Sequence, residues 1–143
     1  MILLDVNVLV EAGHRDAARH SRTAGWLATA LAGPRPVGLA DAVLVGAMRV
    51  LTHRKVFADP ASPSSALAFL DAVRTAPAAV PVPAGPATWR AFAGLVQADG
   101  GVRGNLVPDG WLAALALSHG AVLVTRDRGF RRFTGLRVEV PGD

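Results

Sequence analysis

The sequence of 143 residues contains no cysteine and no tyrosine, and Lys55 is its only lysine. Without cysteine the chain forms no disulfide, offers no thiolate to a metal and has no cysteine nucleophile. No apolar run reaches the roughly 18 residues of a membrane-spanning helix, and Asp5 interrupts the apolar start that a signal peptide needs. We therefore expect a cytoplasmic protein without a membrane segment.

The sequence also has little charge, since charged residues make up 18% of it and hydrophobic residues 51%. This balance excludes a disordered chain, and we expect residues 1–143 to form one domain with a substantial core. The isoelectric point of about 11.2 overstates the basicity, because almost nothing titrates between histidine and arginine. The net charge of +4 permits a polyanionic partner but does not require one.

Short apolar runs alternate along the chain with stretches in which apolar residues recur at helical spacing. The predicted strands are 2–5, 36–40, 79–83, 121–125 and 136–140. The predicted helices lie within 17–33, 41–54, 62–75, 86–99 and 108–120, three of them with proline at or near their start. This alternation predicts an α/β fold with helices on both faces of a mostly parallel sheet of about five strands.

Four aspartates follow or feed the predicted strands at the edge where an open parallel sheet binds its ligands: Asp5, Asp41, Asp109 and Asp127. Three of them also have ordinary explanations. Asp41 and Asp109 stand where an N-cap or a first-turn acid stabilises a helix, and Asp127 can begin a turn. No helix cap is evidently needed around Asp5, inside LLDVNVLV.

Converging carboxylates repel one another unless a cation lies between them. Because no histidine or cysteine accompanies these aspartates, the ligands would all be oxygen atoms. Such a set suits Mg²⁺, with Mn²⁺ as the alternative. The natural substrate of a site of this kind is a phosphate ester.

Three stretches carry a resemblance to a known family: MILLDVNVLV, MRVLT and GNLVPDGWLAALALSHGAVLVTRDRGFRRFTGLRVEVP. Together they resemble a PIN domain of the VapC kind, the ribonuclease toxin of bacterial VapBC toxin–antitoxin pairs, over nearly the whole chain. The resemblance implies a three-layer fold and a metal-dependent endoribonuclease that leaves a 5′-phosphate and a 3′-hydroxyl. It also implies a VapB-type antitoxin as partner, and a homodimer.

The resemblance assigns roles to individual residues. Asp5, Asp109 and Asp127 match the metal-holding acids, and Asp41 is the candidate for a fourth catalytic acid. Asn7, Asn105 and Thr125 are expected to orient carboxylates or waters. The arginines around this edge are either a solvated surface or contacts for RNA phosphates, and we predict the second role for five of them: Arg49, Arg126, Arg128, Arg131 and Arg132.

Two positions depart from the family pattern. Many members have a glutamate where this chain has Gly46, and a further acid where it has Gly129. Asp41 either replaces the missing glutamate or plays a supporting or capping role. The two glycines also keep open a second interpretation, in which a degenerate PIN domain binds RNA or a protein partner without cleaving.

Overall fold

The computed structural model describes residues 1–142 of the chain. Over these residues it contains five strands: β1 (Ile2–Leu4), β2 (Val37–Leu39), β3 (Ala79–Pro81), β4 (Val122–Val124) and β5 (Arg137–Glu139). All neighbouring strands pair in parallel. The predicted α/β fold with a sheet of about five strands is confirmed, and the sheet is parallel throughout.

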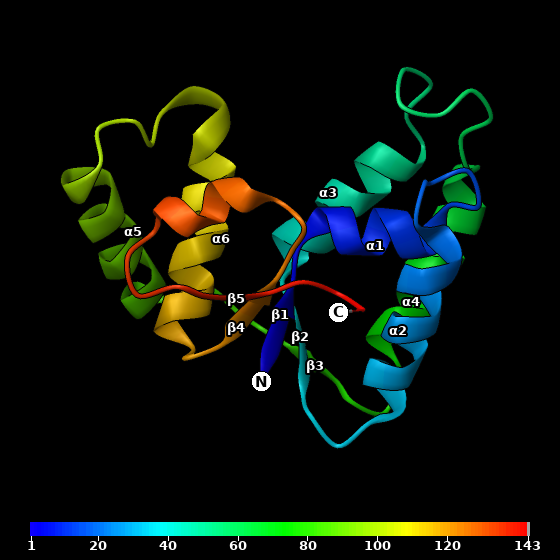
Figure 1. Ribbon diagram of the computed structural model, residues 1–143, viewed down its shortest axis with the longest axis horizontal. Coiled ribbons are helices and arrows are strands. Elements are labelled where there is room, and N and C mark those ends of the chain that lie inside the picture. The colour runs from blue at the N-terminus through cyan, green and yellow to red at the C-terminus, as the bar shows by residue number, and fades with distance from the viewer. Residues whose placement is uncertain (143) are drawn as a thin grey trace.

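The connections between strands are mainly helical. The helices of the described chain are α1 (Val6–Gly13), α2 (His20–Ala32), α3 (Asp41–Leu51), α4 (Pro63–Arg74), α5 (Pro86–Ala98) and α6 (Val107–Ser118), with short 3-10 helices η1 (Gly104–Leu106) and η2 (Arg128–Arg132). Figure 1 shows α5 and α6 on one side of the sheet and α1 to α4 on the other. These are the three predicted layers, in which helices cover both faces of a parallel sheet. Within residues 1–142, no helix combines the length and apolar character needed to cross a membrane.

The strands lie in the order β3-β2-β1-β4-β5. The chain builds the sheet outward from β1 in one direction and then returns to add β4 and β5 on the other side of β1. In open parallel sheets, ligands bind beyond the carboxyl ends of the strands at such a reversal of order. Here the reversal lies between β1 and β4, whose last residues Leu4 and Val124 are paired in register.

Asp5 follows β1 and turns the chain directly into a helix. Its backbone is extended and its side chain accepts a hydrogen bond from the Val6 amide, so Asp5 is the N-cap of α1. The expectation that no cap is needed here was wrong. The stretch VNVLVEAG is rich in valine, which has a low helix propensity, but complete burial of Val8 and Leu9 outweighs that propensity.

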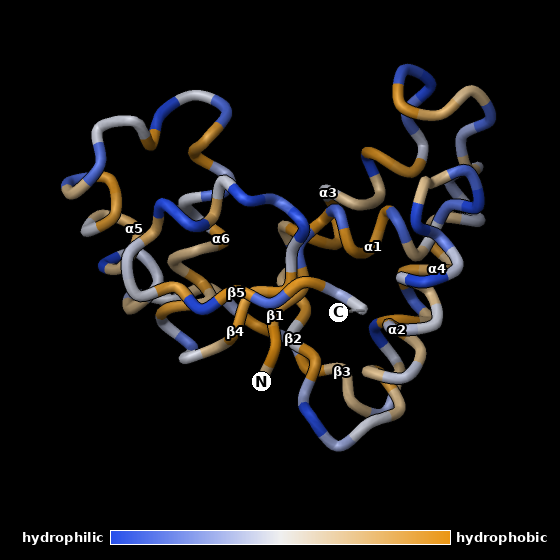
Figure 2. The backbone as a smooth tube through the Cα atoms, viewed as in Figure 1, coloured by the Kyte–Doolittle hydropathy of each residue, from blue (hydrophilic) through white to orange (hydrophobic). Residues whose placement is uncertain are grey.

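The centre of the sheet supports this edge rigidly. Leu3, Leu4, Leu123 and Val124 have no exposed surface, and interiors packed in this way move little. Figure 2 shows the chain as hydrophobic through β1 and β4 and hydrophilic in the loop that leaves β4 toward η2. Polar side chains at the ends of these two strands are therefore held by a dry, close-packed core.

Candidate active site

Asp5 lies at the carboxyl end of β1 and is only 8% exposed. Its Oδ2 atom accepts hydrogen bonds from the Thr125 hydroxyl at 2.6 Å and from the Asn7 side-chain amide at 2.7 Å. Its Oδ1 atom accepts one from the Val6 amide at 2.6 Å. Because both oxygens are held, the orientation of the Asp5 carboxylate is fixed by the fold.

The Thr125 hydroxyl links Asp5 to a second carboxylate. Besides donating to Asp5, its oxygen accepts hydrogen bonds from the Asn7 side chain at 2.9 Å and from the Asp127 amide at 3.0 Å. Asp127 is the N-cap of η2 and accepts a hydrogen bond from the Gly129 amide at 2.7 Å. Thr125 uses its single donor and both acceptor positions, and thereby sets Asp5 and Asp127 relative to each other.

Asp109 brings a third carboxylate from the first turn of α6. Burial raises the pKa of Asp109 above its ordinary value, and the carboxylates of Asp127 and Asp5 raise it further. Burial also raises the pKa of Asp5, hydrogen bonds from Thr125 and the Val6 amide lower it, and Asp127 raises it again. Three negative charges therefore repel one another at the β1–β4 reversal.

This set of side chains fits a hard divalent cation, because all of its ligands would be carboxylate oxygens. The half-buried Asp109 side chain accepts no hydrogen bond from residues 1–142, so its oxygens are available to a ligand. In the described chain, no three acidic or histidine side chains lie close enough together to enclose a metal by themselves. Mg²⁺ usually retains several waters and binds directly to one or two carboxylates, so the ion would be held partly through water.

Asp41 follows β2, the neighbour of β1 in the sheet. Asp41 occupies the first turn of α3, one of its two expected positions, and is exposed. It lines a cavity of about 130 Å³ together with Arg74 and Val80, on the β3 side of β2. Its side chain makes no hydrogen bond or ion pair with any described residue, and it is not among the charges that shift the pKa of Asp5 or Asp109.

Two of the three residues predicted to support the site contact Asp5, and the third does not. Asn7 and Thr125 both bond to the Asp5 carboxylate. Asn105 lies in η1, is exposed, and forms no hydrogen bond within residues 1–142. The structure therefore connects two of the three predicted supporting residues to the site and leaves Asn105 outside the network.

The two glycines that stand in place of acids adjoin the site. A β-carbon on Gly46 would lie 2.8 Å from the Val6 side chain, and one on Gly129 would lie 2.9 Å from Asp127 Oδ1. Both distances are shorter than a normal contact, so a side chain at either position would require the Val6 or the Asp127 side chain to shift.

Two of the five predicted phosphate contacts also have carboxylate partners within the protein. Arg126 pairs with Glu11 at 2.8 Å and its side chain is 15% exposed, and Arg132 pairs with Asp99 at 2.8 Å. The contact of these two arginines with RNA stays a prediction. The side chains of the remaining three are exposed and form no hydrogen bond or ion pair with described residues: Arg49, Arg128 and Arg131.

Glu11 is a supporting residue that the sequence pattern did not reveal. Its Oε2 atom accepts hydrogen bonds from Arg126 Nε and from the Thr23 hydroxyl, both at 2.8 Å. One turn earlier on α1, Asn7 accepts a hydrogen bond from the Arg126 backbone amide at 3.3 Å. The two α1 residues together hold the segment that carries Asp127. Their four-residue spacing is a helical signal, but it is visible only once 6–13 is recognised as a helix.

Comparison with known proteins gives the class of this site and fold. Residues 2–136 match the family described as the PIN domain. Ribonuclease VapC43 from Mycobacterium tuberculosis is 42% identical over 143 residues, which is 100% of this chain and 97% of the relative. Ribonuclease VapC31 from the same organism is 34% identical over 137 residues, 96% of each chain.

Among solved structures, the chain is similar to VapBC2 from Rickettsia felis bound to a DNA fragment from its promoter. The TM-score is 0.68 at 20% identity, over 99% of both chains, and at this identity the likeness shows the fold alone. The chain belongs to the PIN-domain family and, within it, to the VapC ribonucleases. The resemblance seen in the sequence is thereby confirmed.

Proposed function

We propose that this VapC-type ribonuclease is a Mg²⁺-dependent endoribonuclease and the toxin of a type II toxin–antitoxin pair. The observation that carries the proposal is the group of three mutually repelling carboxylates at the β1–β4 reversal, on a chain whose relatives are named VapC ribonucleases. In this proposal residues 1–143 act as one nuclease domain in the cytoplasm.

VapC nucleases of the PIN family are generally dependent on a divalent metal. Asp5, Asp109 and Asp127 would hold Mg²⁺, or Mn²⁺ in its place, directly or through water. Asp41 is kept as the candidate for a fourth catalytic acid. When bound, the ion lowers the pKa of a coordinated water and neutralises charge on the phosphodiester.

The side chains of the protein hold this arrangement in place. Asp5 cannot rotate away, because Thr125, Asn7 and the Val6 amide hold both of its oxygens. The Asp109 side chain has no such donor, so its oxygens are free to coordinate the ion or to accept hydrogen bonds from its waters. The ion held by Asp5, Asp109 and Asp127 would supply an activated water. Attack of that water on phosphorus with cleavage of the P–O3′ bond and transfer of a proton to the 3′-oxygen would give a 5′-phosphate and a 3′-hydroxyl.

The proposed partners follow from the relatives. The similar Rickettsia felis structure contains a VapBC complex, and on this ground we propose a VapB-type antitoxin that covers the carboxylates. We also propose a homodimer as the assembly of the toxin. RNA is the proposed substrate.

The test is RNA cleavage by the purified protein in Mg²⁺, with EDTA and with Asp5→Asn. We expect both to abolish cleavage, and excess Mg²⁺ to restore it only to the EDTA-treated wild type. Asp71→Asn, which changes an exposed acid paired with Arg74, is the matched control and should cleave normally. Cleavage by Asp5→Asn near the wild-type rate would refute the assignment. RNA binding without any metal-dependent cleavage would instead identify the degenerate PIN domain that Gly46 and Gly129 suggest.

A further inference from the structure

A cavity of about 370 Å³ is lined almost wholly by arginine. Its walls come from the start of α2, the loop after β4, η2 and the segment after β5, and its lining residues are Arg19, Arg22, Arg126, Arg128, Arg131 and Val140. Arg126 and Arg128 flank Asp127 in the sequence, so the loop that carries Asp127 also forms part of the wall of this arginine cavity. Arg19 and Arg22, from α2, are not among the arginines predicted to contact RNA.

The fold neutralises only part of the positive charge in the arginine cavity. Arg126 is paired with Glu11, and Arg22 donates to the carbonyl oxygen of Gly142. Arg19, Arg128 and Arg131 are exposed, and none of their three guanidinium groups has a hydrogen bond or ion pair to residues 1–142. Three guanidinium groups thus stand around one hollow without an anion from the described chain.

The start of α2 gives a second reason to expect an anion in the arginine cavity. Its N-cap residue, Arg19, makes no side-chain cap, and its first turn contains no acid. The free amides at a helix start carry partial positive charge, so basic side chains there oppose the helix dipole. No contact of Arg19 within the described chain offsets this arrangement. An anion bound in the arginine cavity would offset it.

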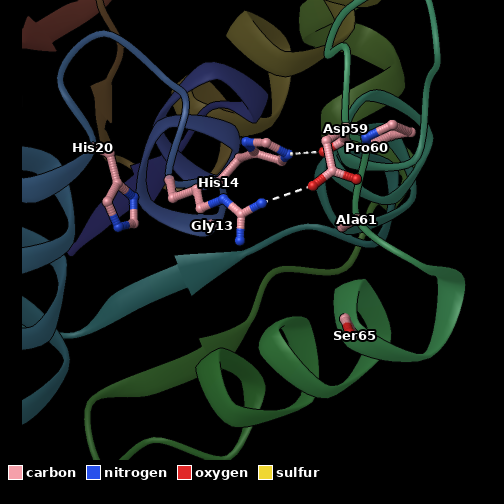
Figure 3. A pocket seen from close by; sticks show the side chains of 8 residues that line it. Gly13, His14, His20, Asp59, Pro60, Ala61 and Ser65 are labelled. Carbon is pink, nitrogen blue, oxygen red and sulfur yellow. Dashed lines mark hydrogen bonds and ion pairs between the residues drawn. The ribbon is translucent and has the colours of Figure 1, made fainter.

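A second cavity shows the contrasting case, in which charges are paired internally. It measures about 390 Å³ and lies where the segment after α1 meets the loop before α4 (Figure 3). There Arg15 donates to the Asp59 carboxylate at 2.7 Å, and His14 Nε2 donates to the Asp59 carbonyl at 2.9 Å. Arg15 and His14 of this second cavity have partners within the fold, whereas the guanidinium groups of Arg19, Arg128 and Arg131 in the arginine cavity have none within residues 1–142.

We propose that the arginine cavity binds phosphate groups of the RNA strand next to the phosphodiester that is cleaved. This inference rests on the proposed function. The planar guanidinium matches phosphate oxygens, and the RNA backbone must be attracted past carboxylates that repel it. An acidic protein segment offers similar charge, but the position beside Asp127 favours the strand whose phosphate is cleaved there.

The experiment measures binding of a fluorescent single-stranded oligoribonucleotide of mixed sequence, since phosphate contacts are independent of sequence. The full-length Asp109→Asn protein is used without metal, so that no cleavage occurs. The cavity set combines three substitutions in this protein: Arg19→Gln, Arg128→Gln and Arg131→Gln. The control set, with the same change of charge, is Arg54→Gln, Lys55→Gln and Arg90→Gln, which are exposed and have no ion pair in the described structure.

Each lost contact to single-stranded RNA should reduce the slope of log K against log salt concentration by about 0.7. We expect the cavity set to reduce the slope by about 2 in total and to weaken binding at least about tenfold at low salt, and the control set to change neither measurably. Arg19→Gln alone should not lower the melting temperature, whereas a structural arginine would.

Equal salt slopes for the cavity set and the control set would overturn the inference. Unchanged RNA binding combined with lost binding of a poly-glutamate probe would also overturn it, and would assign the cavity to an acidic protein partner. A different assay tests the proposed function itself. If the wild-type protein does not cleave RNA in the presence of Mg²⁺, the proposed function fails, whatever salt slopes the binding experiment gives.

Discussion

The ends of β1 and β2 lie side by side in the sheet, and an aspartate starts the helix region after each. Asp5, after β1, is buried and held by donors from α1 and from the end of β4. Asp41, after β2, is exposed and has no bonded partner in the described structure. The topology accounts for the difference. β1 stands beside β4, which returns from the other half of the chain, whereas β2 stands beside β3. An acid in a similar local position gains neighbouring carboxylates only where the strand order reverses.

The largest expected effect on RNA cleavage is that of a substitution among the carboxylates at the β1–β4 reversal. Asp109→Asn should lower RNA cleavage at least about 100-fold and yet raise the melting temperature of the metal-free protein by about 1–3 °C. Burial and the charges of Asp127 and Asp5 raise the pKa of Asp109, so a neutral side chain relieves an unfavourable charge. The dipole of α6 favours an acid at this position, and the prediction is that burial and repulsion outweigh it.

Cleavage assays and calorimetry on the same Asp109→Asn preparation would check both effects. A fall in the melting temperature together with lost cleavage would contradict the prediction, because it would mean that Asp109 supports the fold instead of binding a ligand.

The next largest effects, on stability and on cleavage, are expected for Glu11, the α1 residue that pairs with Arg126 next to Asp127. Glu11→Ala leaves the Arg126 guanidinium without its carboxylate in a largely buried position, which should cost about 1–3 kcal/mol of stability. Cleavage should fall roughly 10-fold at a temperature where the variant is folded. Urea unfolding and RNA cleavage measure the two effects.

The matched control for Glu11→Ala is Glu139→Ala. Glu139 pairs with Arg35, and about half of each side chain is exposed, so its loss should cost about 0–1 kcal/mol and leave cleavage unchanged. Equal effects of the two variants would show that the Glu11 pair does not position Asp127.

A smaller effect is expected in the pH dependence of stability. The pKa values of Asp5 and Asp109 are raised above 3.8, so the folded, metal-free protein binds more protons than the unfolded chain between 3.8 and those raised values. Its stability should therefore fall as pH rises through this window. A divalent ion needs deprotonated carboxylates, so the gain in melting temperature on adding Mg²⁺ should grow over the same range. Thermal scans at several pH values would check this, and a gain that is independent of pH would contradict it.

The alternation of apolar runs and helical stretches was sufficient to predict the strands and the layers, because both follow from local hydrophobic spacing. The helix α1 was not predictable in this way, since its valine-rich sequence is helical only through packing against the core. The carboxylates Asp5, Asp109 and Asp127 were predictable from their places at strand and helix ends. The ion-pair partners of the arginines were not, because Glu11 and Arg126 are 115 residues apart and nothing local links them.

The smallest effect on RNA cleavage is predicted for a substitution of Asp41, which follows β2. Asp41→Asn removes an exposed charge without a bonded partner in residues 1–142, and an interaction of an exposed charge is worth at most about 1 kcal/mol. Cleavage should therefore fall by less than about fivefold, which is within reach of a direct rate comparison with Asp5→Asn. A loss as large as that of Asp5→Asn would break the comparison between the two strand ends. In that case α3 must shift when RNA or the ion binds, and Asp41 would be the acid that compensates for Gly46.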